Sequence, residues 1–97
     1  MPNALLTFEV RRVNALYESE AATIRSILEK VLEQDGWERP VPHIHTTYKK
    51  IGFSGDPLAT FRAAVAISRK ETAVTDGMVR VDYALMISPL DPLTGRL

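Results

Sequence analysis

The stretch RPVPHIHTTYKKIGF, residues 39–53, concentrates the side chains most able to do chemistry. His43 and His45 would lie on one face of an extended strand, where two imidazoles can bind a metal ion or transfer protons near pH 7. A catalytic zinc site takes three protein ligands and a structural site four, and no third ligand stands at a diagnostic spacing. We therefore expect no metal site. Together with Lys49 and Lys50, the histidine pair predicts a basic strand on a polar surface.

The chain contains no cysteine, which excludes disulfide scaffolds, thiolate zinc sites and cysteine nucleophiles, and fits a reducing compartment such as the cytoplasm. The glycine motifs that bind phosphates or dinucleotides, the zinc-protease motif and the nucleophile elbow are all missing from the sequence. We expect no cofactor, and a protein that is not an enzyme is the favoured interpretation.

The formal charge is zero, but it is spread unevenly. Residues 43–70 carry five basic and one acidic side chain, residues 1–42 five and seven, and residues 71–97 two and four. This basic middle segment could attract an anionic partner, or it could balance acidic neighbours within one fold. Nucleic-acid binding is a minor alternative because the basic footprint is modest. Its candidate residues are Lys49, Lys50, Arg62, Arg69 and Lys70.

The scaffold for these residues begins with a strand and a helix. Leu6, Phe8 and Val10 alternate with polar residues, which predicts a half-buried strand over residues 4–13. The next segment has one apolar stripe at helical spacing, formed by Ile24, Ile27, Leu28, Val31 and Leu32.

Local signals also predict both ends of this helix. Ser19 is the expected N-cap, and Gly36 is the expected C′ residue in the left-handed conformation. Trp37 would then pack on Leu32 as a lid on the core. Pro40 and Pro42 stop any continuation of the helix, so the chain must turn back.

The second half of the chain predicts three more strands. The first covers residues 43–53 and ends in the turn segment GFSGDP. Residues 59–70 are ambiguous: their alanines suit a helix, but Phe61, Val65 and Ile67 also fit a period of two, and we favour a strand. Asp76 and Gly77 provide the turn into a last strand over residues 78–88, whose expected inner face is Val79, Val81, Tyr83, Leu85 and Ile87.

We therefore expect one α+β domain over residues 1–97, in which a single amphipathic helix covers a four-stranded, mainly antiparallel sheet in the order β-α-β-β-β. Residues 89–97, with two prolines and a glycine, are expected to form an extended C-terminal arm. No stretch approaches the roughly 20 apolar residues of a membrane span. A soluble, cytoplasmic protein that does not bind membranes is expected.

One helix can cover only one face of such a sheet, so the composition of the opposite face predicts function. That face is expected to carry small apolar side chains rimmed by charge, which is typical of a surface that packs against a protein partner. We predict a homo-oligomer or a partner-binding protein, such as a structural component of a phage or mobile element, an inhibitor or an adaptor. The predicted interface residues are Ala64, Ala66, Met78, Ala84 and Met86.

An enzymatic alternative comes from the segment MPNALLTFEVRR, which is followed by an amphipathic helix and a second strand. This arrangement resembles the tautomerase superfamily, whose members use an N-terminal proline as a general base. The resemblance covers about the first 55 residues, and the segment IGFSG is similar to the family's glycine-rich segment. It implies Pro2 as the base and Arg11 or Arg12 as the residue that binds a substrate carboxylate.

Overall fold

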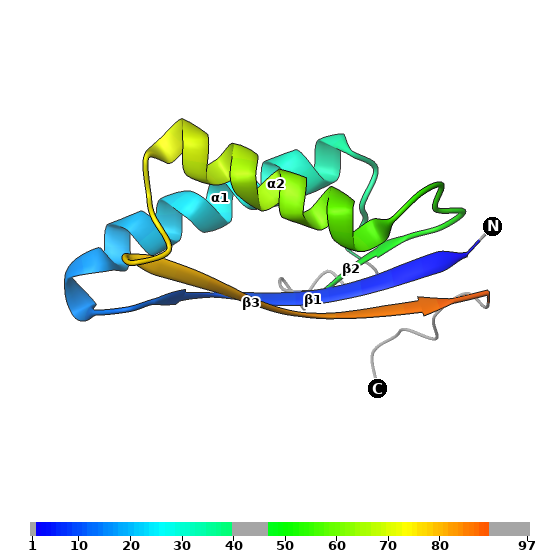
Figure 1. The fold of residues 1–97 in the computed structure, drawn as a ribbon, viewed down its shortest axis with the longest axis horizontal. Helices are drawn as coiled ribbons and strands as arrows, with labels where there is room; N and C mark the ends of the chain where they lie inside the picture. The colour runs from blue at the N-terminus through cyan, green and yellow to red at the C-terminus, as the bar shows by residue number, and fades with distance from the viewer. Residues whose placement is uncertain (1, 40–46, 90–97) are drawn as a thin grey trace.

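The structure, a computed structural model, describes residues 2–39 and 47–89, which form a two-layer α+β domain with the element order β-α-β-α-β (Figure 1). Two helices lie on one face of a three-stranded antiparallel sheet, in which β1 is the central strand between β2 and β3. The elements are β1 (Asn3–Arg12), α1 (Glu18–Gln34), β2 (Thr47–Lys50), α2 (Pro57–Thr72) and β3 (Val79–Ser88), with a short 3-10 turn, η1 (Ala15–Tyr17), before α1.

The two long strands confirm the alternating pattern of the sequence. In β1, the even-numbered residues from Ala4 to Val10 are buried against the helices, whereas Thr7 and Glu9 are exposed. β3 pairs with β1 over its whole length, from Asn3 opposite Ser88 to Arg12 opposite Val79. The predicted inner face of β3 faces the helices, because residues opposite one another in an antiparallel ladder share a face.

α1 ends as the sequence predicts and begins differently. Gly36 adopts a φ of +90°, its N–H donates to the Glu33 carbonyl, and the N–H of Trp37 donates to the Leu32 carbonyl at 3.0 Å, as in a Schellman ending. Ser19 is not the N-cap, because η1 leads directly into a helix that begins at Glu18. The Asn14 side chain instead accepts a hydrogen bond from the N–H of Leu16, so the capping contact lies one turn earlier.

The prediction of a strand over residues 59–70 is wrong, because this segment belongs to the helix α2. The Asp56 side chain accepts a hydrogen bond from the N–H of Leu58 at 3.0 Å, and Pro57 occupies the first helical turn. Such a cap offsets the unpaired N–H groups of a helix start. Phe61, Ala64 and Ser68 then form the buried stripe at helical spacing.

The helix α2 also connects two parallel strands. β2 and β3 both run antiparallel to β1, so they are parallel to one another and lie on opposite sides of it. A hairpin cannot join parallel strands, and a crossover by a helix is the usual solution. Among the described residues the sheet has three strands rather than the four predicted, with an isolated bridge between Glu38 and Lys49 on the far side of β2.

The core lies between the helices and the inner face of the sheet. Phe8 stacks on Tyr48 and contacts Phe61, with ring centroids 5.8 and 5.7 Å apart. Trp37 is buried against Phe53, in agreement with its predicted role as a lid. Of the predicted strand over residues 43–53, the structure has β2; residues 43–46 and most of the predicted C-terminal arm lie outside the described residues.

Candidate interaction surface on the sheet

Both helices lie on the same side of the sheet, and within the described residues no element covers the opposite, outer face (Figure 1). Side chains on this face come from alternate positions of the three strands. From β1 they are Leu5, Thr7, Glu9 and Arg11, from β2 Thr47 and Lys49, and from β3 Arg80, Asp82, Ala84, Met86 and Ser88.

Three apolar residues lie together on this face and are called the outer patch: Leu5, Ala84 and Met86. Leu5 is directly opposite Met86 in the ladder, and Ala84 is opposite Thr7. The Met86 side chain is 67% exposed. A long apolar side chain with this exposure on an uncovered sheet face is available for contact with another protein surface.

The structure places two of the five predicted interface residues in the outer patch, Ala84 and Met86. Ala64 and Ala66 were predicted on the assumption that residues 59–70 form a strand. Met78 was predicted on the assumption that the last strand begins at residue 78. Ala64 lies in the core on the buried side of α2, and Ala66 is exposed on the other side of that helix. Met78 precedes β3 and packs against the core. The five predicted residues therefore do not lie on one surface.

The other end of the outer face is charged. Arg11 lies opposite Arg80, and Glu9 opposite Asp82, so like charges face one another in the ladder. The diagonal pair of Arg11 and Asp82 partly offsets this repulsion, with Nη1 and Oδ2 3.4 Å apart. Both side chains are more than half exposed, so this ion pair stabilises the fold little. An open pocket of about 500 Å³ lies over this end, lined by Arg11, Arg12, Val13, Arg80 and Asp82.

The hydrogen bonds between β1 and β3 determine which backbone groups of β3 point away from β1. The N–H of Val13 donates to the Met78 carbonyl at 2.9 Å, so this pair belongs to the hydrogen-bonded class of the β1–β3 ladder. The classes alternate along antiparallel strands. The even-numbered residues of β3 therefore bond to β1, and the odd-numbered residues from Val79 to Ile87 direct their N–H and C=O groups away from it.

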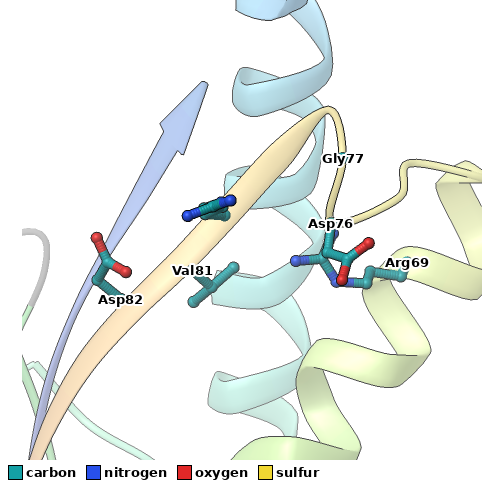
Figure 2. Close-up of a pocket in the computed structure, with 6 residues that line it drawn as sticks. Arg69, Asp76, Gly77, Val81 and Asp82 are labelled. Carbon is teal, nitrogen blue, oxygen red and sulfur yellow. The ribbon is translucent and has the colours of Figure 1, made fainter. Parts of the chain in front are cut away.

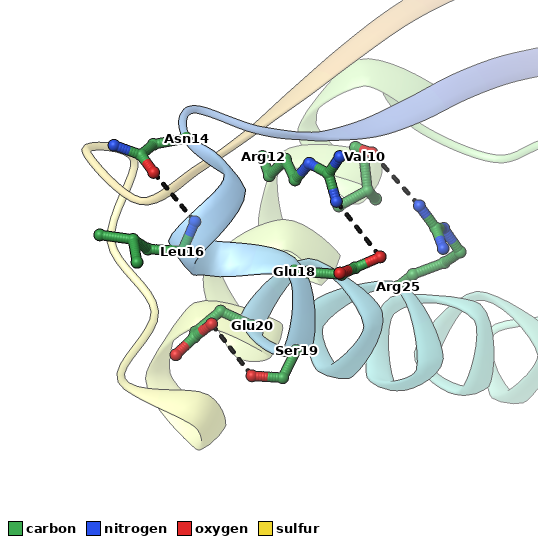
Figure 3. A network of polar contacts seen from close by, with 8 residues as sticks. All are labelled: Val10, Arg12, Asn14, Leu16, Glu18, Ser19, Glu20 and Arg25. Atoms are coloured by element: carbon green, nitrogen blue, oxygen red, sulfur yellow. Dashed lines mark hydrogen bonds and ion pairs between the residues drawn. The ribbon is translucent and has the colours of Figure 1, made fainter.

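Within the described residues, an arginine occupies one backbone carbonyl on each side of the sheet. Arg69 of α2 donates to the carbonyl of Val79 at 3.0 Å and to that of Val74 at 3.3 Å. Figure 2 shows the surface pocket of about 480 Å³ beside this contact, between the end of α2 and the start of β3. On the other side, where β1 extends beyond β2, Arg25 of α1 donates to the carbonyl of Val10 at 3.3 Å (Figure 3).

The predicted basic strand does not form one face. His43 and His45 lie outside the described residues. Lys49 is on the outer face, opposite Leu5, whereas Lys50 is on the helix side. The ammonium of Lys50 donates to the Asp35 carbonyl at the end of α1 and lies 4.8 Å from the centre of the Phe53 ring. Lys50 therefore stabilises a helix end.

A polar cluster that sequence reasoning missed lies where α1 meets β2. Arg39 donates to the hydroxyl of the buried Tyr48 at 3.1 Å and pairs with Glu29 at 3.1 Å. Burial raises the pKa of the Tyr48 phenol, and the hydrogen bond from Arg39 opposes this change. The hydrogen bond to Tyr48 also raises the pKa of Arg39. The phenol therefore stays neutral well above physiological pH, which suits a structural contact.

The residues implied by the tautomerase resemblance are not brought together within one chain. Pro2 lies just before β1, and its carbonyl accepts a hydrogen bond from the N–H of Phe53. Arg11 and Arg12 lie at the opposite end of the strand. Nine extended residues separate Pro2 from Arg11 by about 30 Å. Arg12 pairs with Glu18 at 3.2 Å (Figure 3).

Neither a cluster of metal ligands nor a membrane-spanning helix occurs within residues 2–39 and 47–89. No group of three or more histidine or carboxylate side chains in this part of the chain could hold a metal ion. Its helices are also too short or too polar to cross a membrane.

Comparisons with known proteins add one similarity of fold. No family model matches the chain, and no curated protein matches it. Among solved structures, it is similar to the domain of unknown function DUF77 from Bacillus cereus, at 18% identity and a TM-score of 0.45. The match covers 98% of this chain and 82% of the other. Function does not transfer between chains at this level of similarity.

Proposed function

We propose that this protein acts by assembly rather than by catalysis, and that the outer face of its sheet is the surface through which copies of the chain associate. The observation that carries this proposal is the outer patch, in which the exposed Met86 lies opposite Leu5 and beside Ala84. Such a patch, bordered by Lys49 and Thr7, combines an apolar centre with a polar rim.

The charged end of the outer face supports the same proposal. Two of its three arginines have carboxylate partners, since Arg11 pairs with Asp82 and Arg12 with Glu18. The pocket above them is open to solvent and offers little of the apolar enclosure that small ligands use. The charges are balanced, so this end suits a rim that orients a protein contact.

The test compares two equivalent substitutions. Met86→Lys places a charge in the outer patch, and Leu16→Lys changes another exposed apolar residue, 79% exposed, in the turn before α1. In sedimentation velocity over about 1–100 μM, we expect the wild type to have a mass above the 10.8 kDa of one chain. Met86→Lys should lower that mass, and Leu16→Lys should leave it unchanged.

Two results would contradict the proposal. One is a wild-type mass of a single chain over the whole concentration range. The other is equal loss of mass in both variants, which would mean that added charge, rather than the outer patch, disrupts association.

A further inference from the structure

The edge of β3 is free to accept one more strand. Val81, Tyr83, Leu85 and Ile87 direct their backbone N–H and C=O groups away from β1, and no strand of the described chain pairs with them. Val79 belongs to the same series, but Arg69 already occupies its carbonyl. The unpaired part of the edge therefore begins after Val79.

This edge lacks several of the features that usually prevent pairing, although Arg80 and Asp82 are charged. Natural edge strands carry lysines, prolines or bulges. β3 contains no lysine and no proline, and its register with β1 is continuous over the whole strand. Tyr83 and Ile87 are also 46% and 56% exposed, so apolar side chains border the open backbone groups.

We propose that β3 pairs antiparallel with β3 of a second copy, with Ala84 on the two-fold axis, and that the two sheets join into one sheet of six strands. This inference rests on the proposed assembly function and adds a specific contact to it. The new contact is made by the edge of the sheet and is separate from any contact made by its outer face.

The register follows from which residues are open. With Ala84 on the axis, Val81 pairs with Ile87 of the second copy and Tyr83 pairs with Leu85. All four open residues are then used, each in a pair that exchanges two hydrogen bonds.

Neighbouring registers satisfy fewer of these groups. With Tyr83 on the axis, Ile87 faces Val79, whose carbonyl is bound by Arg69. With Leu85 on the axis, Val81 faces Pro89, which has no N–H. Ala84 is therefore the centre that satisfies the most backbone groups.

The side chains fit the same register. On the helix side, every facing pair is apolar. On the outer face, Asp82 lies opposite Met86 and Arg80 opposite Ser88 of the second copy, so like charges do not face one another. Ala84 lies opposite Ala84 of the second copy. This pair exchanges no hydrogen bonds, so the two backbones approach most closely there and a small side chain fits.

The segment that follows β3 contains a residue unsuited to pairing with this edge, because Pro92 lacks the N–H that a pairing strand must donate. A second copy offers a complete and matching strand.

The inference is tested by single cysteines, because the chain has none of its own. In the proposed register, the two copies of residue 84 have Cα atoms about 4.5 Å apart, within the range of a disulfide. We expect Ala84→Cys to form a reducible covalent dimer under mild oxidation. Asp82→Cys and Met86→Cys lie on the same face but about 13 Å from their own copies, so we expect at least tenfold slower crosslinking.

A second pair of variants tests the edge without any crosslink. Ile87→Pro removes an N–H that faces away from β1, and so leaves the ladder within the chain intact. Ile87→Thr makes a comparable change in the side chain and keeps this N–H. We expect the proline variant to weaken dimerisation about tenfold relative to the threonine variant, because each dimer loses two hydrogen bonds.

The outcomes separate this inference from the proposed function. If Ala84→Cys does not crosslink faster than both controls, the proposed edge pairing is wrong, even when Met86→Lys still lowers the mass of the wild-type assembly. If Ala84→Cys crosslinks but Met86→Lys has the wild-type mass, the edge pairing holds and the outer patch is not the contact surface. Met86→Lys does not disturb the edge, since it places a lysine opposite Asp82 of the second copy.

Discussion

Arg69 in the last turn of α2 donates a hydrogen bond to the backbone carbonyl of Val79, with Nη2 and O 3.0 Å apart. Arg25 of α1 makes the equivalent contact with Val10 on the other side of the sheet. Each helix thus places one guanidinium against a carbonyl that no strand of the described residues bonds. A backbone carbonyl without a partner is costly where water is partly excluded, so these arginines stabilise the fold where strand pairing stops.

We expect Arg69→Met to lower the free energy of unfolding by about 1–3 kcal/mol, because the carbonyls of Val74 and Val79 lose a charged donor. Urea denaturation followed by circular dichroism would measure the change. Arg62→Met is the matched control, since Arg62 lies on the same helix and is exposed. Equal losses in the two variants would show that the contact with β3 is unimportant for stability.

We expect Asp56→Ala to lower the free energy of unfolding by about 1 kcal/mol, because the first turn of α2 loses its side-chain cap. Asp76→Ala removes the same charge from the turn before β3 and should change stability by less than about 0.5 kcal/mol. Thermal unfolding of both variants provides the measurement. A neutral effect of Asp56→Ala would mean that α2 is held by its packing alone.

The buried Tyr48 should make the fold less stable at alkaline pH. Its pKa in the folded state is raised above the ordinary value of 10.0, mainly by burial. As the pH rises above about 10, the unfolded chain loses this proton first, so the free energy of unfolding falls with pH until the folded-state pKa is passed.

Tyr48→Phe removes this contribution, so we expect a shallower fall in stability above pH 10. At neutral pH this variant should be less stable by about 1 kcal/mol, because Arg39 loses an acceptor. Urea denaturation at several pH values gives both quantities. Tyr83→Phe, at a half-exposed ring, is the control, and an identical alkaline slope in Tyr48→Phe and the wild type would contradict the expectation.

Elements with a strong local pattern were predicted correctly. The alternation in residues 4–13 and 78–88 agrees with β1 and β3, and the ending of α1 at Gly36 agrees because only a few conformations end a helix. These signals depend on neighbouring residues alone. Tertiary packing therefore changed these elements little.

The prediction of a strand over residues 59–70 was wrong for a specific reason. Its apolar residues fit a period of two as well as a helical period, and its alanines carry little information about either. The cap formed by Asp56 with Pro57 was visible in the sequence but was interpreted as a turn. This error moved Ala64 from the core to a predicted surface, whereas Ala84 and Met86 were placed correctly because the alternation of β3 is clear.

Spacing along the chain was enough to predict most helices and strands and the apolar face of each long strand. The folded chain was needed to show that β1 is central, that β3 has an open edge within the described residues, and that Arg25 and Arg69 occupy the carbonyls of Val10 and Val79. Strand order and edge contacts join residues far apart in sequence. No local period encodes which of them will meet.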